Sequence, residues 1–173
     1  MTGKKLGLSN CHGFTLIEMM IVAVVIGTVA SLAAPSFQRA YDRHNFRSGQ
    51  QDAISTLKKA RSYAISTKEP HGVYVDPDAR TLTVFENSVN PTGSSFEDGD
   101  SAISVDTLSE DFQYVYADIE NSAIVFQPNG SARVTGYGNI YLSGETEGMM
   151  AYISISVLAS TGRISAYSNF YAW

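Results

Sequence analysis

The chain has 173 residues, a formal net charge of −5 and a single cysteine, Cys11. This length fits one folded domain with one further segment, and the 44% share of hydrophobic residues is ordinary once the apolar run near the N-terminus is counted. Because the only thiol lies so close to the N-terminus, the rest of the chain can form no disulfide, no cysteine nucleophile and no cysteine-ligated metal site.

The first element is an apolar run, residues 14–34, which follows a short basic leader at residues 1–13. The run has 21 residues and one charge, Glu18. As a helix it would span roughly 32 Å, enough for the core of a bilayer. A lone carboxylate in that setting costs about 3 kcal/mol, so it predicts a cationic partner in the same apolar layer. Cleavage between Gly13 and Phe14 would create such a partner, the new α-amino group, which could pair with Glu18 of a staggered copy.

Two other interpretations of this segment stay open. One is an ordinary secretory signal cut near Ser31-Leu32-Ala33, and the other is a membrane anchor that is never cut. A secretory signal usually has an uncharged apolar core of about 7–15 residues. The longer run with Glu18 inside it therefore favours cleavage after Gly13.

The end of the apolar run contains residues that weaken a helix. Gly27 lies in the second half of the run, and Pro35 directly follows the last residue of the run, Ala34. Proline removes one backbone hydrogen bond and disturbs the preceding turn, so we expect a kink or a local loosening between Gly27 and Pro35. The alternative is that Pro35 is simply tolerated, as in many membrane helices.

Residues 35–68 are expected to continue as an amphipathic helix that ends before Pro70. One apolar stripe at a spacing of three and four residues should pack against a sheet. Its members are Ala53, Ile54, Leu57, Ala60, Ala64 and Ile65. An earlier group, Phe37, Ala40 and Tyr41, has polar neighbours and is expected to project from the fold.

Residues 69–173 change to a period of two, which is typical of strands. Short runs centred on 73–75 and 82–85 flank Asp76-Pro77-Asp78, a hairpin signal. Further strands are expected at 103–105, 112–116, 124–126, 132–134, 139–142, 151–158 and 163–167, with loops at 87–101 and 143–148. We therefore predict an α+β fold, in which a long N-terminal helix packs against an antiparallel sheet of about eight strands.

Charge is unevenly divided between these parts. Residues 35–68 carry a net charge of +5 and residues 69–173 a net charge of −11. Solubility is one explanation, and electrostatic matching between neighbouring molecules is another.

Residues Gly13-Phe14-Thr15-Leu16-Ile17-Glu18-Met19-Met20 resemble the prepilin-peptidase site of type IV pilins and type II secretion pseudopilins. The resemblance implies cleavage after Gly13, N-methylation of Phe14 and a role for Glu18 in filament assembly. Four more stretches resemble minor pilins and pseudopilins of the GspH/FimT type. They are residues 33–37, 60–65, 126–130 and 158–164.

The resemblance implies a structural subunit rather than an enzyme, acting in the assembly or initiation of a type IV pilus or a type II secretion pseudopilus. Its partners would be the prepilin peptidase, major and other minor pilins or pseudopilins, and inner-membrane lipid before assembly. We expect a single-pass protein of the bacterial inner membrane with a periplasmic head, which could later join a pilus or a pseudopilus. Neither machine is favoured over the other by these residues.

Other chemistry finds little support, and we expect no cofactor. Two separate histidines, His44 and His71, do not suggest a metal site. The acidic loop at 97–100 lacks the spacing of a calcium-binding EF-hand loop, and a solvated loop is the simpler reading. The alternative function is a FimT-like DNA receptor for natural transformation. In those proteins a Gly-Arg pair is followed, one residue later, by a second arginine. This chain has the pair at Gly162-Arg163, but Ser165 stands where the second arginine would be. We therefore do not expect nucleic acid as a partner.

Overall fold

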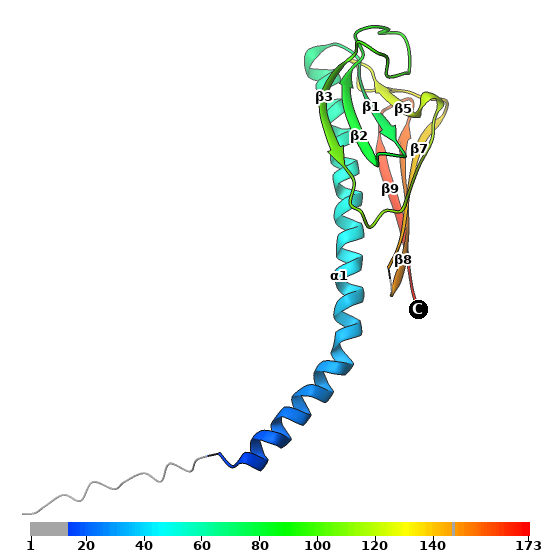
Figure 1. Cartoon of the computed structure of the whole chain (residues 1–173). Coiled ribbons are helices and arrows are strands. Elements are labelled where there is room, and N and C mark those ends of the chain that lie inside the picture. Colours follow the sequence, from blue (N-terminus) through cyan, green and yellow to red (C-terminus); the bar gives the residue numbers. More distant parts are fainter. Residues whose placement is uncertain (1–13, 147) are drawn as a thin grey trace, which may run out of the picture. The chain divides into compact units, whose positions relative to one another are not determined.

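The computed structural model describes residues 14–146 and 148–173. The chain divides into two compact units, residues 1–37 and residues 38–173, and we call the second unit the head. Helix α1 (Leu16–Thr67) runs without a break from the first unit into the second, with Pro35 inside it. Figure 1 shows the strands of the head following α1 in chain order.

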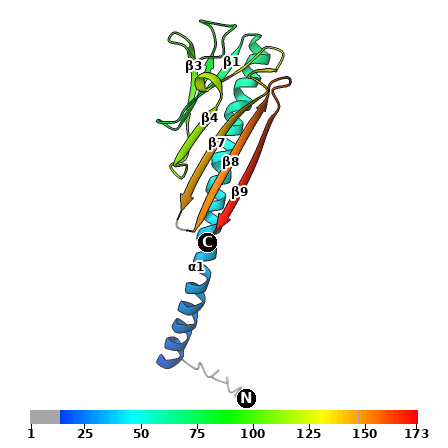
Figure 2. The ribbon, with the colours of Figure 1, turned by 90° about the vertical axis from the view of Figure 1, so that its right-hand side faces the viewer.

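The head contains nine strands in two antiparallel sheets. They are β1 (His71–Asp76), β2 (Thr81–Glu86), β3 (Ser101–Thr107), β4 (Tyr114–Asp118), β5 (Ala123–Phe126), β6 (Ala132–Arg133), β7 (Tyr137–Thr146), β8 (Met149–Leu158) and β9 (Ile164–Ala172), with a short 3-10 helix, η1 (Glu120–Ser122), before β5. One sheet has the order β3-β2-β1-β5-β6 and the other the order β4-β7-β8-β9. Figure 2 shows the strands of the second sheet side by side in front of α1.

One hydrophobic core joins the C-terminal half of α1 to both sheets. The stripe predicted from the sequence supplies Ala53, Leu57, Ala60 and Ala64, all fully buried. Burial alternates along β4, β7 and β8, as β8 shows: Ile153, Ile155 and Val157 are buried, while their neighbours are not. In β5, by contrast, all four residues are buried. The period of two in the sequence therefore reports which side of the strand meets the helix.

The buried stripe of α1 extends about three turns further toward the N-terminus than the sequence predicts, from Ala53 back to Asp42. Phe46 is fully buried and Asp42 is 5% exposed. The ring of Phe46 meets Phe112 edge to face at 5.6 Å between centroids, in the segment between β3 and β4. Phe37 and Tyr41, in contrast, are exposed, as expected.

Three details of the strands differ from the sequence-based expectations. The head has nine strands in two sheets rather than about eight in one. The loop predicted at 143–148 is wrong for most of its length, because β7 continues to Thr146 and pairs with Met149 of β8. The C-terminal strand is longer than expected, because β9 reaches Ala172 and pairs with β8 along its length. Alternation in these segments is masked by glycine, serine and acidic residues that also fit a loop.

Candidate functional site

The described part of the first unit is an apolar helical segment with no partner in the structure. Every residue from Phe14 to Leu32 is exposed, and Leu16 and Leu32 are 79% and 82% exposed. This is the one described helix that is long and apolar enough to cross a membrane, by length and composition. An apolar surface that surrounds the whole helix requires lipid or other helices around it.

Glu18 lies in the first turn of α1, where a carboxylate is favoured by the helix dipole. Its backbone N–H donates to Thr15 Oγ1 at 3.3 Å, so Thr15 and Glu18 stand at the spacing of an N-terminal capping box. Its side chain is exposed among apolar residues, and no contact of its carboxylate with a cation is seen among residues 14–146 and 148–173. Gly13 and the leader lie outside the described residues, so cleavage and methylation at Gly13 and Phe14 stay predictions.

The segment from Gly27 to Pro35 carries two hydroxyl side chains that bond back to the helix backbone. Thr28 Oγ1 donates to the carbonyl of Val24 at 2.7 Å, and Ser31 Oγ donates to the carbonyl of Gly27 at 2.8 Å. Such bonds satisfy hydroxyl groups in apolar surroundings and often bend helices. The kink between Gly27 and Pro35 stays a prediction.

Three of the stretches that resemble minor pilins converge on one side chain in the head, Arg61. Its Nε donates to the carbonyl of Gly130 at 2.9 Å, and its Nη2 donates to the carbonyl of Thr161 at 3.0 Å. The arginine therefore joins the end of α1 to the turn after β5 and to the turn after β8.

Gly162 allows this convergence. It has a φ of +61°, and a Cβ there would lie only 2.1 Å from the carbonyl oxygen of Gly130. A residue with a side chain would separate the two turns that Arg61 holds together. Arg61 thus holds the turns after β5 and β8 against the helix. Arg163, on the turn after β8, is exposed.

The buried carboxylate of Asp42 makes a second link between α1 and a turn. Asp42 Oδ2 accepts from Thr146 Oγ1 at 2.8 Å, at the end of β7, and Oδ1 accepts from Gln38 Nε2 at 2.9 Å. Asp42 was not predicted from the sequence, although its spacing of four residues from Phe46 places it on the buried stripe.

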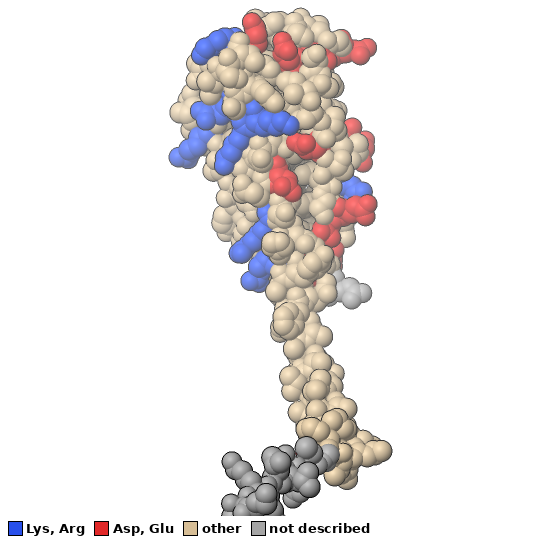
Figure 3. All heavy atoms as spheres, turned by 90° about the vertical axis from the view of Figure 1, so that its left-hand side faces the viewer, with Lys and Arg blue, Asp and Glu red and all other residues tan. Residues whose placement is uncertain are grey.

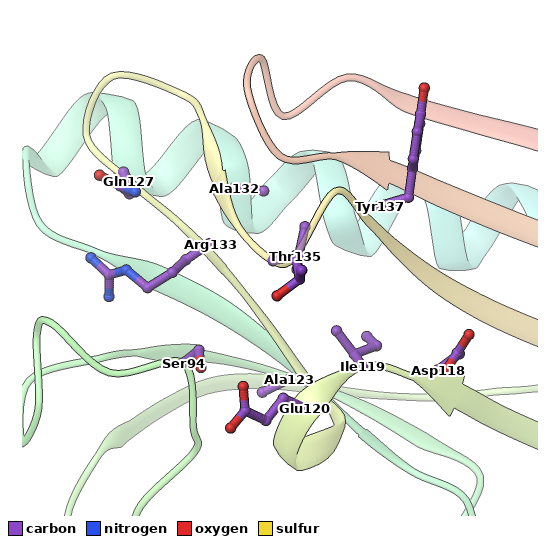
Figure 4. A pocket seen from close by; sticks show the side chains of 11 residues that line it. Ser94, Asp118, Ile119, Glu120, Ala123, Gln127, Ala132, Arg133, Thr135 and Tyr137 are labelled. Carbon is purple, nitrogen blue, oxygen red and sulfur yellow. The ribbon is translucent and has the colours of Figure 1, made fainter.

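One hollow of the head is polar and open, with a volume of about 580 Å³. Figure 4 shows its lining, in which Glu120 belongs to η1, and Arg133 and Thr135 come from β6 and the residues after it. Arg133 does not offer its charge freely, because its guanidinium donates to the carbonyls of Pro91 and Gly93. The hollow holds no paired nucleophile and base among the side chains that line it.

The remaining candidates for chemistry are dispersed or occupied. No group of three His, Cys, Asp or Glu able to hold a metal ion occurs among the residues that the structure describes. His44 is exposed on α1, whereas His71 is buried and stacks near Tyr63. In the acidic loop, Asp100 accepts hydrogen bonds from the backbone N–H groups of its own loop, including that of Glu97 at 2.9 Å, so this carboxylate shapes the loop.

Comparison with known proteins agrees with this geometry. The family model described as the prokaryotic N-terminal methylation motif matches residues 8–34. The chain is 32% identical over 97 residues to the type IV narrow pilus major component PilA5 of Thermus thermophilus, which covers 56% of this chain and 78% of the relative. It is 23% identical over 128 residues to the type II secretion system core protein G of Vibrio cholerae, which covers 73% of this chain and 85% of the relative.

A solved structure has a similar fold. It is the type IV minor pilin FimU of Pseudomonas aeruginosa, with a TM-score of 0.53 and 14% sequence identity. The similarity covers 72% of this chain and 90% of FimU. The order of elements, one long N-terminal helix followed by antiparallel sheets, is shared.

Proposed function

Since the chain belongs to the type IV pilin and pseudopilin family, we propose that it is a structural minor subunit that takes part in the assembly or initiation of a type IV pilus or a type II secretion pseudopilus. Proteins of this family are structural subunits. We further propose that prepilin peptidase cleaves between Gly13 and Phe14 and that Phe14 is N-methylated. Before assembly the protein would reside in the inner membrane, with its head in the periplasm.

The observation that carries this proposal is the bare apolar helix with one carboxylate. The segment from Leu16 to Leu32 exposes apolar side chains on all sides, so it suits both lipid and a bundle of like helices. Glu18 lies four residues after Phe14. An α-amino group at Phe14 of one subunit could therefore pair with Glu18 of a staggered neighbour, and this pairing would favour insertion into the bundle over residence in lipid.

The test is Glu18→Ala in the native host, with Asp52→Ala as the matched control. Asp52 is an exposed carboxylate on the same helix, within the head. We expect both variants to be cleaved, as measured by intact mass, and only Glu18→Ala to be lost from the sheared or purified filament fraction. Normal incorporation of Glu18→Ala would contradict the pairing mechanism, and an intact terminus at Met1 would contradict processing.

A second experiment separates the two machines. Deletion of the whole chain is scored for twitching motility and for secretion of exoproteins, and whichever is lost identifies the machine. The alternative function, a DNA receptor, predicts salt-sensitive binding of DNA by the full-length chain in detergent. Residues 69–173 contain three Lys or Arg side chains, and one of them, Arg133, already donates hydrogen bonds to backbone carbonyls. We therefore expect the strands of the head not to bind DNA.

A further inference from the structure

The outward face of the four-stranded sheet is built largely from tyrosine. Cross-strand pairing places Tyr116 beside Tyr141, Tyr141 beside Ser154, and Ser154 beside Tyr167. Seven of the ten tyrosines of the chain share this side of the sheet, and we call them the tyrosine face: Tyr114, Tyr116, Tyr137, Tyr141, Tyr152, Tyr167 and Tyr171. All but Tyr141 are between 42% and 71% exposed.

The rings at the centre of this face are already ordered. Tyr116 and Tyr141 stack at 6.2 Å between centroids, and Tyr141 and Tyr152 stack at 6.0 Å. Serine and asparagine fill the positions between them, and Ser156 Oγ donates to Asn139 Oδ1 at 2.7 Å. A mixture of rigid tyrosine with small polar residues is typical of binding surfaces, because the rings lose little conformational entropy on contact.

The two sheets differ in whether a loop covers their outward faces. On the five-stranded sheet, the loop between β2 and β3 folds back, and Phe96 packs on Phe85 at 4.9 Å and on Tyr74 at 5.4 Å between ring centroids. The described chain provides no such covering loop over the tyrosine face. The fold therefore protects one aromatic surface and presents the other.

A small hollow in the tyrosine face suggests the chemistry of its partner. The hollow has a volume of about 170 Å³ and lies between Tyr114 and Tyr152, with Met150 and Glu145 also in its lining. Aromatic walls with one carboxylate suit the cationic end of an arginine or a lysine. The outward strand positions add Asp118 and, among the residues described, no Lys or Arg.

The same chain carries a surface of the opposite character. Arg39, Arg43, Arg47 and Lys58 follow one another along one side of α1, and we call them the basic stripe. Figure 3 shows Lys and Arg gathered along one side of the head and Asp and Glu along another. The guanidinium carbons of Arg43 and Arg47 lie 5.9 and 5.6 Å from the ring centre of Phe170, so the stripe flanks β9 and already contacts an aromatic ring.

We propose that the tyrosine face of one copy binds the basic stripe of a second copy of this chain. The inference rests on the proposed function as a filament subunit. The two surfaces are different patches of one head, so the contact is heterologous and can repeat from subunit to subunit. Stacking of arginine on tyrosine and attraction to Glu145 and Asp118 would set the register of neighbouring heads.

The test places the photo-crosslinker p-benzoylphenylalanine at Tyr116 in the full-length chain, expressed in the native host. After illumination we expect a covalent dimer in the filament fraction, with the cross-linked peptide of the second copy mapping to residues 39–58. The matched control carries the same group at Val105, which is 58% exposed on β3 of the other sheet, and it should give no product with that peptide. Reversal of charge by Arg43→Glu with Arg47→Glu should lower the dimer yield at least about fivefold.

The outcomes separate this inference from the proposed function. A chain that enters filaments normally but gives no dimer, a dimer joined through two tyrosine faces, or an adduct with a different protein, a glycan or lipid would each overturn the inference and leave the subunit role intact. Normal incorporation of Glu18→Ala, by contrast, would contradict the pairing mechanism of the proposed function and leave the contact between heads standing. A dimer at 39–58 that persists after charge reversal would overturn the role of the basic stripe.

Discussion

The N-terminal half of α1 and the head expose apolar surface in two different ways. From Leu16 to Leu32 the exposed side chains are largely aliphatic and surround the helix, whereas the largest group of exposed apolar side chains in the head is aromatic and lies on one side of one sheet. A surface that surrounds a helix can be covered by any apolar medium, because van der Waals contact and burial have no direction. A one-sided surface with stacked rings and hydroxyls selects a partner by shape and charge. From this comparison we expect the helix to supply attachment and the head to supply specificity.

The largest expected effect comes from comparing the same substitution, leucine to alanine, in the core of the head and on the exposed apolar segment of α1. Leu57→Ala removes a fully buried side chain between helix and sheets, and Leu32→Ala removes one that is 82% exposed. We expect the first change to lower the free energy of unfolding of the head by about 2–5 kcal/mol. The second should change it by less than about 0.5 kcal/mol. Urea denaturation of the purified chain in detergent, followed by near-ultraviolet circular dichroism, measures both, and equal effects would remove the distinction.

The next effect concerns the arginine that holds two turns to the helix. Arg61→Ala leaves the carbonyl of the buried Gly130 without its donor, and we expect a loss of about 1–3 kcal/mol. Arg163→Ala, exposed on the turn after β8 that Arg61 also contacts, is the control and should be close to neutral. The same denaturation assay reports both variants. Equal stability of the two would show that the turns hold their places without Arg61.

A smaller effect is expected at Asp42, whose buried carboxylate bonds to the end of β7. Asp42→Asn replaces a charged acceptor of two hydrogen bonds by a neutral amide, and the weaker bonds to Thr146 and Gln38 should cost about 1–2 kcal/mol. Asp52→Asn makes the same change at an exposed position of the same helix and should have no measurable effect. If both variants unfold at the wild-type denaturant concentration, Asp42 is not a link between α1 and the end of β7.

The smallest effect lies at the start of α1. Thr15→Ala removes the side-chain acceptor for the N–H of Glu18, a change that costs about 1 kcal/mol in local helix stability. Amide hydrogen exchange of the first turn should become faster, while exchange in the head should stay unchanged. Faster exchange in both regions would mean that the two units are more tightly coupled than the comparison implies.

Much of this fold could be predicted from local patterns. The hairpin of β1 and β2 follows from Asp76-Pro77-Asp78 between two alternating runs, and the buried side of β8 follows from its period of two. The pairing of β1 with β5 could not be predicted in this way, because it joins segments about fifty residues apart with no matching signal in either. Phe46 was missed because polar residues surround it in the sequence, so that the stripe becomes clear only when Asp42 and the glycine at position 49 are accepted as buried members.

The candidate site divides in the same way. Gly13, Phe14 and Glu18 form a contiguous motif, and contiguous motifs can be recognised without a structure. Arg61, Gly130 and Gly162 lie on three separate turns, and only folding brings them within hydrogen-bonding distance. The tyrosine face is a product of register, since its members come from four strands and look in the sequence like isolated aromatic residues.

The tyrosine face also gives the molecule an optical property. The chain has a single tryptophan, Trp173, which directly follows β9, the strand that bears Tyr167 and Tyr171. Light absorbed by tyrosines close to that indole can pass to it, and the indole itself is 60% exposed. Emission from Trp173 on tyrosine excitation is thus an intrinsic, label-free signal of whatever comes to lie against these strands.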